Sequence, residues 1–346
     1  MAIKQTKQLE SLMQEAFDRK ASFLYMIPNE PPVFRIKDKI ERGQGGALTV
    51  EQVKDIATAA FGENDLKDIG SETGQLTTLC TLAGVVEGRM SVTRVSGDYV
   101  LTVRMLPAKL PDAELLKIPQ AILKAAMMPK GLVIFTGPTG SGKTTSLFSV
   151  LDYINSKRAC NISTIEHSAG YHLAGKQAVI QQREVGVDAP DMMTGISVSV
   201  SQDADVLMIG ELRNPEEIEM CIMVSQNLLV LTQLHADLPE DAVQRMIDNL
   251  PEDNTGATGR RILAEKLRGV CAQRLLPRAD GKGLVAAYSV LIPDEEMRKA
   301  IIEKQDISKR KTPLPKDCQT MAEYIKQLHR DGVISEKTKN EVLAEI

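Results

Sequence analysis

Residues 137–144, with the sequence GPTGSGKT, have the composition and spacing needed to bind phosphate groups. They follow an apolar run, LVIFT at 132–136, and lead into a helical pattern. Glycines leave backbone N–H groups open to a polyphosphate, and the start of a helix adds a positive dipole. Because the G-x-x-x-x-G-K-[ST] pattern stands between a strand and a helix, it predicts a nucleotide triphosphate site.

The polar residues of this loop have separate expected roles, and ATP and Mg²⁺ are the expected cofactors. The ammonium of Lys143 is expected to reach the β- and γ-phosphates, and the hydroxyl of Thr144 to bind Mg²⁺. The predicted nucleotide-binding residues are Gly137, Pro138, Thr139, Gly140, Ser141, Gly142, Lys143, Thr144 and Thr145.

Hydrolysis needs more than a phosphate loop, because an acid must orient water and a cation must neutralise charge on the transferred phosphoryl group. Glu211 follows the apolar run VLMI, which places it at the carboxyl edge of a sheet, where the phosphate loop also lies. It is our candidate for the water-orienting base; the alternative is that it caps the following helix. Glu166 and His235 end two other predicted strands at this edge, although each taken singly also suits a solvated strand end.

The elements that position these residues form an α/β pattern. Short apolar runs at 132–136, 161–166, 205–211 and 228–235 are separated by stretches long enough for crossover helices. Such runs are typical of buried strands in a mainly parallel sheet with helices on both faces. The chain end, from 318 onward, is predicted to form a small helical cap.

The N-terminal part has a different pattern. Residues 7–22 place Leu9, Leu12, Met13, Ala16 and Phe17 at helical spacing. A second helix is predicted after a capping box of Thr49 and Gln52, and residues 75–106 alternate as in a hairpin. Four prolines then mark a connection. The predicted domains are therefore 1–106, a proline-rich linker at 107–129, an ATPase domain at 130–292 and a helical region at 293–346.

Composition excludes several classes of protein. The chain has 346 residues, a formal net charge of −4 and 3% aromatic residues, which argues against a nucleic-acid motor. Its five cysteines lie far apart and form no C-x-x-C pair, so zinc or redox chemistry is not expected. The start of the chain lacks a signal-peptide pattern and no apolar run is long enough to cross a bilayer, so a cytoplasmic protein is expected.

Four motifs, in this order along nearly the whole chain, resemble those of the secretion ATPases (the GspE/PilT superfamily), and particularly the PilT-like retraction ATPases of type IV pili. They are GPTGSGKTT at 137–145, QQREVGVD at 181–188, QDADVLMIGELRN at 202–214 and LVLTQLHAD at 229–237. The resemblance implies a PAS-like α+β domain, a RecA-like P-loop NTPase domain and a hexameric ring, with the nucleotide between the two domains.

The resemblance also implies roles for individual residues. Glu211 takes the place of the catalytic acid, which also serves the metal with Thr144, while His235 matches the His-box sensor. Glu166 matches the first acid of the family's Asp box.

Two arginines of the N-terminal sheet, Arg89 and Arg104, resemble the basic residues that approach the phosphates in the family. Arg94 is less well placed. The alternative for each arginine is a solvated side chain on a strand.

The chain departs from the family pattern at the Asp box, which in the family reads roughly I-E-D-P-I-E. Residues 165–170 read IEHSAG, so two carboxylates expected near metal and water are missing. Ser197 and Ser201 stand in a stretch where the family usually has arginine, and Asn214 replaces an aspartate. These changes predict slower hydrolysis, whereas nucleotide binding is expected to suffer less.

Two functions of different class remain open. The first is a hexameric ATPase that couples hydrolysis to pilus retraction, docked on an inner-membrane platform protein at the cytoplasmic face. The second is a nucleotide-binding accessory subunit of a pilus or secretion motor, working with a paralogous ATPase. Retraction rather than extension is favoured because the chain lacks a four-cysteine zinc element and carries EMRKAII at 296–302, which resembles the retraction type's AIRNLI element. A small-molecule P-loop kinase is a remote third possibility.

Overall fold

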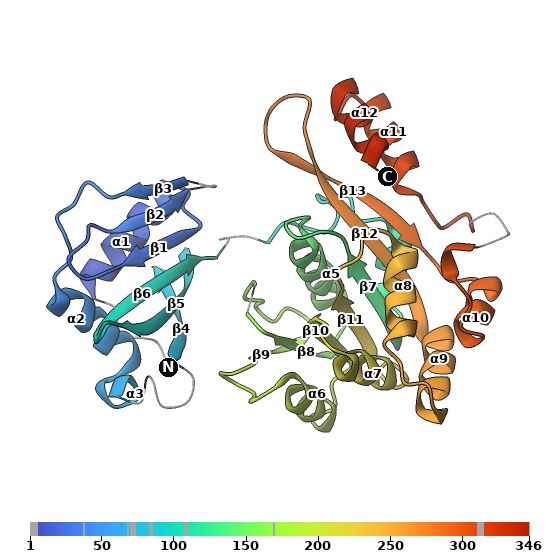
Figure 1. Cartoon of the computed structure of the whole chain (residues 1–346), viewed down its shortest axis with the longest axis horizontal. Helices are drawn as coiled ribbons and strands as arrows, with labels where there is room; N and C mark the ends of the chain where they lie inside the picture. The colour runs from blue at the N-terminus through green and yellow to red at the C-terminus, as the bar shows by residue number, and fades with distance from the viewer. Residues whose placement is uncertain are drawn as a thin grey trace. The chain divides into compact units, whose positions relative to one another are not determined.

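The computed structural model describes residues 6–36, 39–67, 69, 74–82, 86–106, 110–168, 170–309 and 315–345. Two compact units, Met1–Lys109 and Leu110–Ile346, make up the chain. Figure 1 shows helices packed on sheets in both, which agrees with the predicted α/β class. No helix among the described residues has the length and apolar character needed to span a membrane.

The first unit contains a six-stranded sheet in the order β3-β2-β1-β6-β5-β4, in which each pairing is antiparallel. The predicted hairpin is present as β5 and β6, joined by a turn in which Ser96 and Gly97 have φ angles of 52° and 92°. The elements are α1 (Lys7–Asp18), β1 (Phe23–Met26), β2 (Val33–Ile36), β3 (Lys39–Arg42), α2 (Val50–Phe61), α3 (Glu63–Lys67), β4 (Gln75–Leu82), β5 (Val86–Val95) and β6 (Asp98–Met105).

The helices of this unit begin and pack largely as the sequence predicts. The capping box of Thr49 and Gln52 is present at the start of α2, where each residue's side chain accepts a hydrogen bond from the other's backbone N–H. Along α1 the predicted apolar stripe is buried except at Phe17, which is 41% exposed. Phe17 is adjacent to Ala16 and therefore lies 100° further around the helix, at the border of the stripe.

The second unit contains a seven-stranded sheet in the order β13-β12-β7-β11-β10-β8-β9. All of its pairings are parallel except that of β13 with β12. The elements are α4 (Gln120–Ala126), β7 (Gly131–Thr136), α5 (Lys143–Lys157), β8 (Asn161–Glu166), β9 (Val179–Glu184), α6 (Met192–Ser201), β10 (Val206–Glu211), α7 (Pro215–Val224), β11 (Leu229–Gln233), α8 (Pro239–Asp248), α9 (Asn254–Lys266), β12 (Leu267–Pro277), β13 (Leu284–Leu291), α10 (Glu295–Ile302), η1 (Ile307–Lys309), α11 (Met321–Arg330) and α12 (Glu336–Glu345).

Two apolar cores lie on the two faces of this sheet. One joins alternate residues of the central strands to α4 and α5, and the other joins the remaining strand residues to helices α6 through α10 (Figure 1). The four predicted strands of the sheet are confirmed as β7, β8, β10 and β11. Since parallel strands end at one edge, their polar terminal residues are brought together there.

The predicted linker at 107–129 requires a correction. From residue 110 the chain belongs to the second unit, and α4 packs into its core through Ile122, Leu123, Ala125 and Ala126. The prolines lie before α4 or next to its ends, so they limit the length of the helix but do not interrupt it. The start of the predicted linker, 107–109, lies outside the described residues.

Candidate functional site

The phosphate-binding loop joins β7 to α5 in a conformation that requires glycine. Gly137, Gly140 and Gly142 have φ angles of 139°, 78° and 84°, which side chains disfavour. A Cβ at Gly137 would lie 2.3 Å from the carbonyl oxygen of Gln273 on β12, and one at Gly142 would lie 2.9 Å from the Nε2 of Gln273. The backbone of the neighbouring strand therefore leaves no room for a side chain at Gly137, and the positive φ angle disfavours one at Gly142.

Lys143 begins α5 and is held above the loop. Its Nζ donates hydrogen bonds to the carbonyl oxygens of Gly137 at 2.7 Å and Pro138 at 2.9 Å. The side chain is only 7% exposed. Burial lowers the pKa of Lys143, and the negative charge of Glu211 partly opposes that shift. A poorly solvated ammonium in this position attracts phosphate strongly, because little water competes for it.

The two threonines after Lys143 are positioned by residues that sequence reasoning missed. The hydroxyl of Thr144 donates to the Oε1 of Gln233 at 3.1 Å, and the hydroxyl of Thr145 is 2.8 Å from that of Tyr171. Gln233 is the last residue of β11. A polar residue at the end of a buried strand is a sequence signal that could have identified Gln233. Tyr171 lies in a connection between strands and gives no comparable signal.

Glu211 and His235 are paired at the sheet edge. The Nε2 of His235 lies 2.6 Å from the Oε1 of Glu211, and the two side chains are 40% and 33% exposed. Glu211 is also the register partner of Gln233, which contacts Thr144. The structure thus brings these two predicted catalytic residues together, with Glu211 at the end of β10 and His235 two residues after the end of β11.

The oxygen atoms at this edge suit Mg²⁺. The Thr144 hydroxyl, the Gln233 amide and the Glu211 carboxylate supply hard oxygen donors, and Mg²⁺ usually takes one or two protein oxygens beside phosphate oxygens and water. Thr144 and Glu211 are therefore chemically suited to the predicted ion.

Glu166 ends β8 and is almost completely buried, at 4% exposure. Its Oε2 accepts a hydrogen bond from the backbone N–H of Gly170 at 3.2 Å. A Cβ at Gly170 would lie 2.9 Å from the Cγ2 of Thr144 and 3.8 Å from the Oε2 of Glu166. Gly170 therefore lies between the two residues, and a larger side chain would separate them.

His167 occupies the position of the first missing Asp-box carboxylate. Its Nε2 is buried and has no hydrogen-bond partner among the described residues. Burial lowers the pKa of His167, and the charge of Arg213 acts in the same direction, while Glu217 and Glu211 oppose it. The lowered pKa keeps the imidazole neutral near pH 7, so the site lacks the negative charge that an aspartate would supply.

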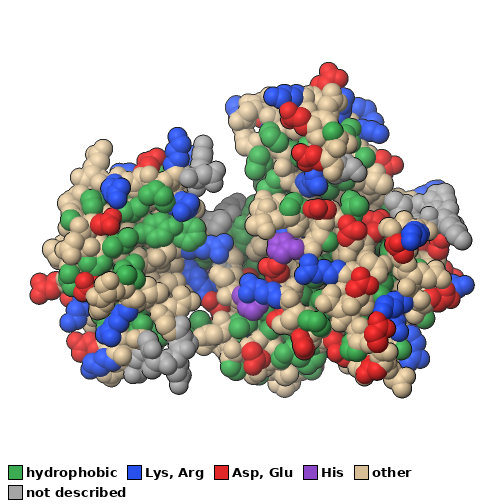
Figure 2. All heavy atoms as spheres, in the orientation of Figure 1, with side chains coloured by type: hydrophobic (Ala, Val, Ile, Leu, Met, Phe, Trp, Pro, Cys, Tyr) green, Lys and Arg blue, Asp and Glu red, His purple; other side chains and the backbone are tan. Residues whose placement is uncertain are grey.

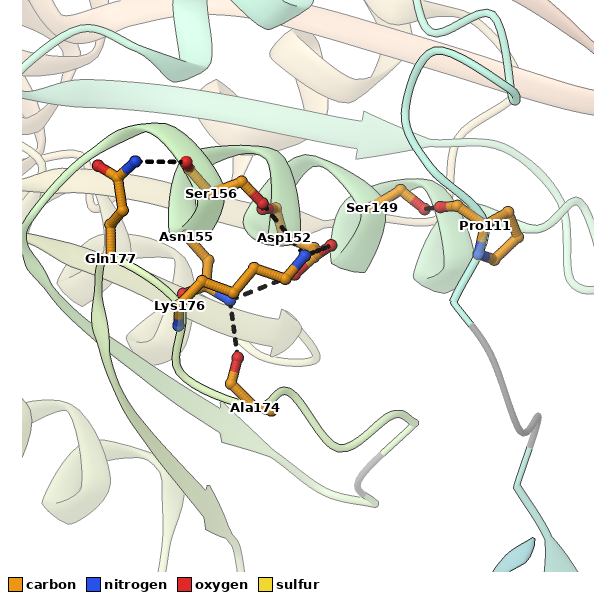
Figure 3. A network of polar contacts seen from close by, with 8 residues as sticks. All are labelled: Pro111, Ser149, Asp152, Asn155, Ser156, Ala174, Lys176 and Gln177. Carbon is orange, nitrogen blue, oxygen red and sulfur yellow. Dashed lines mark hydrogen bonds and ion pairs between the residues drawn. The ribbon is translucent and has the colours of Figure 1, made fainter. Parts of the chain in front are cut away.

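The segment that follows Gly170 is fastened to α5 by the polar network of Figure 3. The Nζ of Lys176 donates to Asp152 at 2.6 Å, and the amide of Asn155 donates to the carbonyl of Ala174 at 2.9 Å. Gln177 adds a hydrogen bond to the carbonyl of Ser156 at 2.8 Å. Since α5 also carries Lys143, Thr144 and Thr145, the network fixes the connection that places Tyr171 against the loop.

The two predicted arginines, Arg89 and Arg104, belong to the first unit, where they are register partners on β5 and β6. Arg89 is 7% exposed, whereas Arg104 is exposed. Arg94 instead lies over the ring of Tyr99, 5.3 Å from its centroid.

Charged side chains also gather on the surface of the second unit. Figure 2 shows histidine side chains on its visible face with acidic and basic side chains around them.

Comparisons with known proteins agree with this geometry. A family model described as Type II/IV secretion system protein matches residues 81–343. A twitching motility protein of Neisseria gonorrhoeae is 29% identical over 308 residues, 88% of this chain and 82% of that protein. The type IV pilus ATPase PilU of Pseudomonas aeruginosa is 28% identical over 334 residues, 95% of this chain and 86% of PilU. A crystal structure of the pilus retraction motor PilT with bound ADP is similar with a TM-score of 0.83 and 30% identity, and covers 96% of each chain.

Proposed function

Because the chain belongs to the type II/IV secretion system protein family, we propose that it is an ATP-hydrolysing motor that drives type IV pilus retraction. The observation that carries this proposal is the pairing of Glu211 with His235 beside a complete phosphate loop. A loop alone would support binding, whereas an acid held at the strand end beside it supports hydrolysis.

In the proposed mechanism the glycine loop and Lys143 bind the phosphates, and Thr144 and Glu211 would hold Mg²⁺. When bound, the ion neutralises charge on the phosphate oxygens. Glu211 orients the attacking water, and His235 holds the Glu211 carboxylate in place through its Nε2. Glu166, buried next to Gly170, is a second acid close to Thr144.

We assign the charge-neutralising cations to Arg89 and Arg104 of the first unit. Their direct opposition on β5 and β6 presents two guanidinium groups from neighbouring strands. Arginine suits this role because its planar group binds phosphate oxygens through two parallel hydrogen bonds.

The remaining parts of the proposal come from the resemblance of the four motifs to those of the secretion ATPases. We propose that the first unit is PAS-like, that the second is RecA-like, and that six copies form a ring. The ring would dock at the cytoplasmic face of the inner membrane on a platform protein, with a paralogous motor ATPase as a further partner.

His167 favours one alternative function. A neutral imidazole in place of a carboxylate removes charge from the site of hydrolysis while leaving the phosphate loop intact. A nucleotide-binding accessory subunit of a pilus or secretion motor, with weak or no hydrolysis, is therefore the second candidate.

Phosphate release and particle mass, measured on the same purified sample, test the proposal. A motor predicts Mg²⁺-dependent phosphate release by a particle of about six chains in the presence of ATP. Nucleotide binding without phosphate release, in a particle of any size, would favour the accessory subunit.

A further inference from the structure

Two buried glutamines flank the phosphate loop, one on each strand next to β7. The neighbours of β7 in the sheet are β11 and β12. Gln233 on β11 is 7% exposed, and its Oε1 accepts a hydrogen bond from the Thr144 hydroxyl at 3.1 Å. Gln273 on β12 is 2% exposed, but its Oε1 has no hydrogen-bond partner among the described residues. The two glutamines therefore differ in whether the amide oxygen is paired.

Gln273 lies directly against the phosphate loop. Its backbone carbonyl oxygen is 2.3 Å from the point where a Cβ of Gly137 would stand, and its Nε2 is 2.9 Å from the corresponding point at Gly142. Gly137 begins the loop, and Gly142 is the N-cap residue of α5. One residue of β12 is thus close to both ends of the loop.

Ser141 brings a hydroxyl to the same place. Its Oγ lies 2.8 Å from the Cβ position of Gly137, which Gln273 also approaches. Ser141 is 4% exposed, and its Oγ has no hydrogen-bond partner in the part of the chain that the structure describes. Buried polar atoms in native proteins almost always have partners. A hydroxyl can donate and an amide oxygen can accept, so these two unpaired groups are complementary.

The strand that carries Gln273 is firmly held, whereas the loop can adjust. β12 pairs with β7 on one side and with β13 on the other. The Nη1 of Arg274, the next residue, donates to the Oε2 of Glu345 on α12 at 3.2 Å, and Leu276 packs in a small apolar core with α11 and α12. The loop contains three glycines with positive φ angles, and glycine gives a backbone more freedom than other residues do. A fixed amide can therefore set the conformation of the loop.

We propose that Gln273 is a positioning residue for nucleotide binding. In the nucleotide-bound loop its Oε1 accepts a hydrogen bond from the Ser141 hydroxyl, and the amide so holds the loop in the conformation that binds phosphate. A hydrogen bond that forms only in the binding conformation adds to nucleotide affinity, because it favours that conformation over the others. The inference rests on the proposed function, since it concerns the same phosphate loop.

A double-mutant cycle tests the pairing, with ADP as the titrant because ADP is not hydrolysed. Ser141→Ala removes the hydroxyl, and Gln273→Met replaces the amide by an apolar side chain of similar volume. Each variant is expected to bind ADP about fivefold more weakly than wild type, since one hydrogen bond is lost. The double variant should also lose about fivefold, rather than about 25-fold, because the two changes remove the same bond.

A control variant and a stability measurement separate positioning from a role in the fold. Ser289→Ala alters a buried serine of β13 whose hydroxyl donates to the carbonyl of Gln319 at 3.0 Å, and it should bind ADP like wild type. Without nucleotide, the free energy of unfolding of the Ser141→Ala and Gln273→Met variants should be no lower than that of wild type. The atoms that these two changes remove have no partner in the described structure to lose.

Three results would overturn this inference and leave the proposed function standing. The first is wild-type ADP affinity in either single variant. The second is a loss in the double variant equal to the product of the single losses, since the two residues would then act independently. The third is a lower free energy of unfolding without nucleotide, since the two residues would then support the fold itself. Failure of the wild-type chain to bind ADP would instead overturn the proposed function.

Discussion

The phosphate loop and the end of β8 lie at the same edge of the sheet. They differ in whether the expected functional groups are present and have hydrogen-bond partners. In the loop, Lys143 and Thr144 each have a protein partner, and the three glycines have positive φ angles that other residues disfavour. At the end of β8, the Nε2 of His167 has no partner in the described part of the chain, and expected carboxylates are missing. Nucleotide binding and turnover therefore depend on different structural elements, and sequence changes can alter one without the other.

Lys143→Ala tests the nucleotide-binding side of this comparison. Removal of a buried ammonium that faces phosphate should weaken ATP binding roughly 100-fold, or about 2.7 kcal/mol. Calorimetric titration measures the change, with Lys157→Ala at the other end of α5 as the control. An affinity within a factor of two of wild type would show that phosphate binds elsewhere.

Glu211→Gln should lower the rate of phosphate release and leave ATP affinity nearly unchanged. The amide keeps the size of the side chain but cannot act as the base, so phosphate release should fall about 10²- to 10⁴-fold while ATP affinity stays close to that of wild type. Glu216→Gln, at an exposed position on α7, is the matched control. Unchanged phosphate release in Glu211→Gln would show that another group orients the water.

His167→Asp should supply one of the carboxylates that are missing at the end of β8 and so raise the rate of phosphate release. It restores a carboxylate where the family has one, and phosphate release should rise roughly tenfold, which corresponds to about 1.4 kcal/mol of activation free energy. His172→Asp, at an exposed position five residues later, controls for the added charge. If His167→Asp releases phosphate no faster than wild type, the neutral imidazole does not limit the reaction.

Tyr171→Phe should have the smallest effect. It removes the hydroxyl that contacts Thr145 but keeps the ring, which packs 5.3 Å from that of Phe148. We expect a loss of about 0.5–1.5 kcal/mol in the free energy of unfolding, measured by denaturant titration. Tyr153→Phe on α5 serves as the control, and an equal loss in both variants would mean that the Thr145 contact contributes nothing specific.

The sequence predicted the strands of the second unit and the polar residues at their carboxyl edge because the signals of both are local. β7, β8, β10 and β11 are continuous apolar runs, and polar residues such as Glu211 follow them directly. The helix α4 was missed because prolines on either side resembled a linker, although its buried residues belong to the main core.

Other features could not be predicted because they depend on distant contacts. Thr144 meets a residue 89 positions away, and the Arg274–Glu345 contact spans 71 positions. Such partners become neighbours only when the parallel sheet and the β12–β13 hairpin are assembled. The lack of partners at Ser141 and His167 is likewise visible only in three dimensions.

A single-turnover experiment tests most directly whether the chain hydrolyses the nucleotide it binds. ATP labelled in the γ-phosphate is bound to an excess of the purified protein, Mg²⁺ is added, and the reaction is quenched at increasing times. Wild type is predicted to convert all bound ATP to ADP and phosphate, whereas Glu211→Gln holds it intact. Bound ATP that stays intact on the wild-type chain would contradict the motor and identify the protein as a nucleotide-binding subunit.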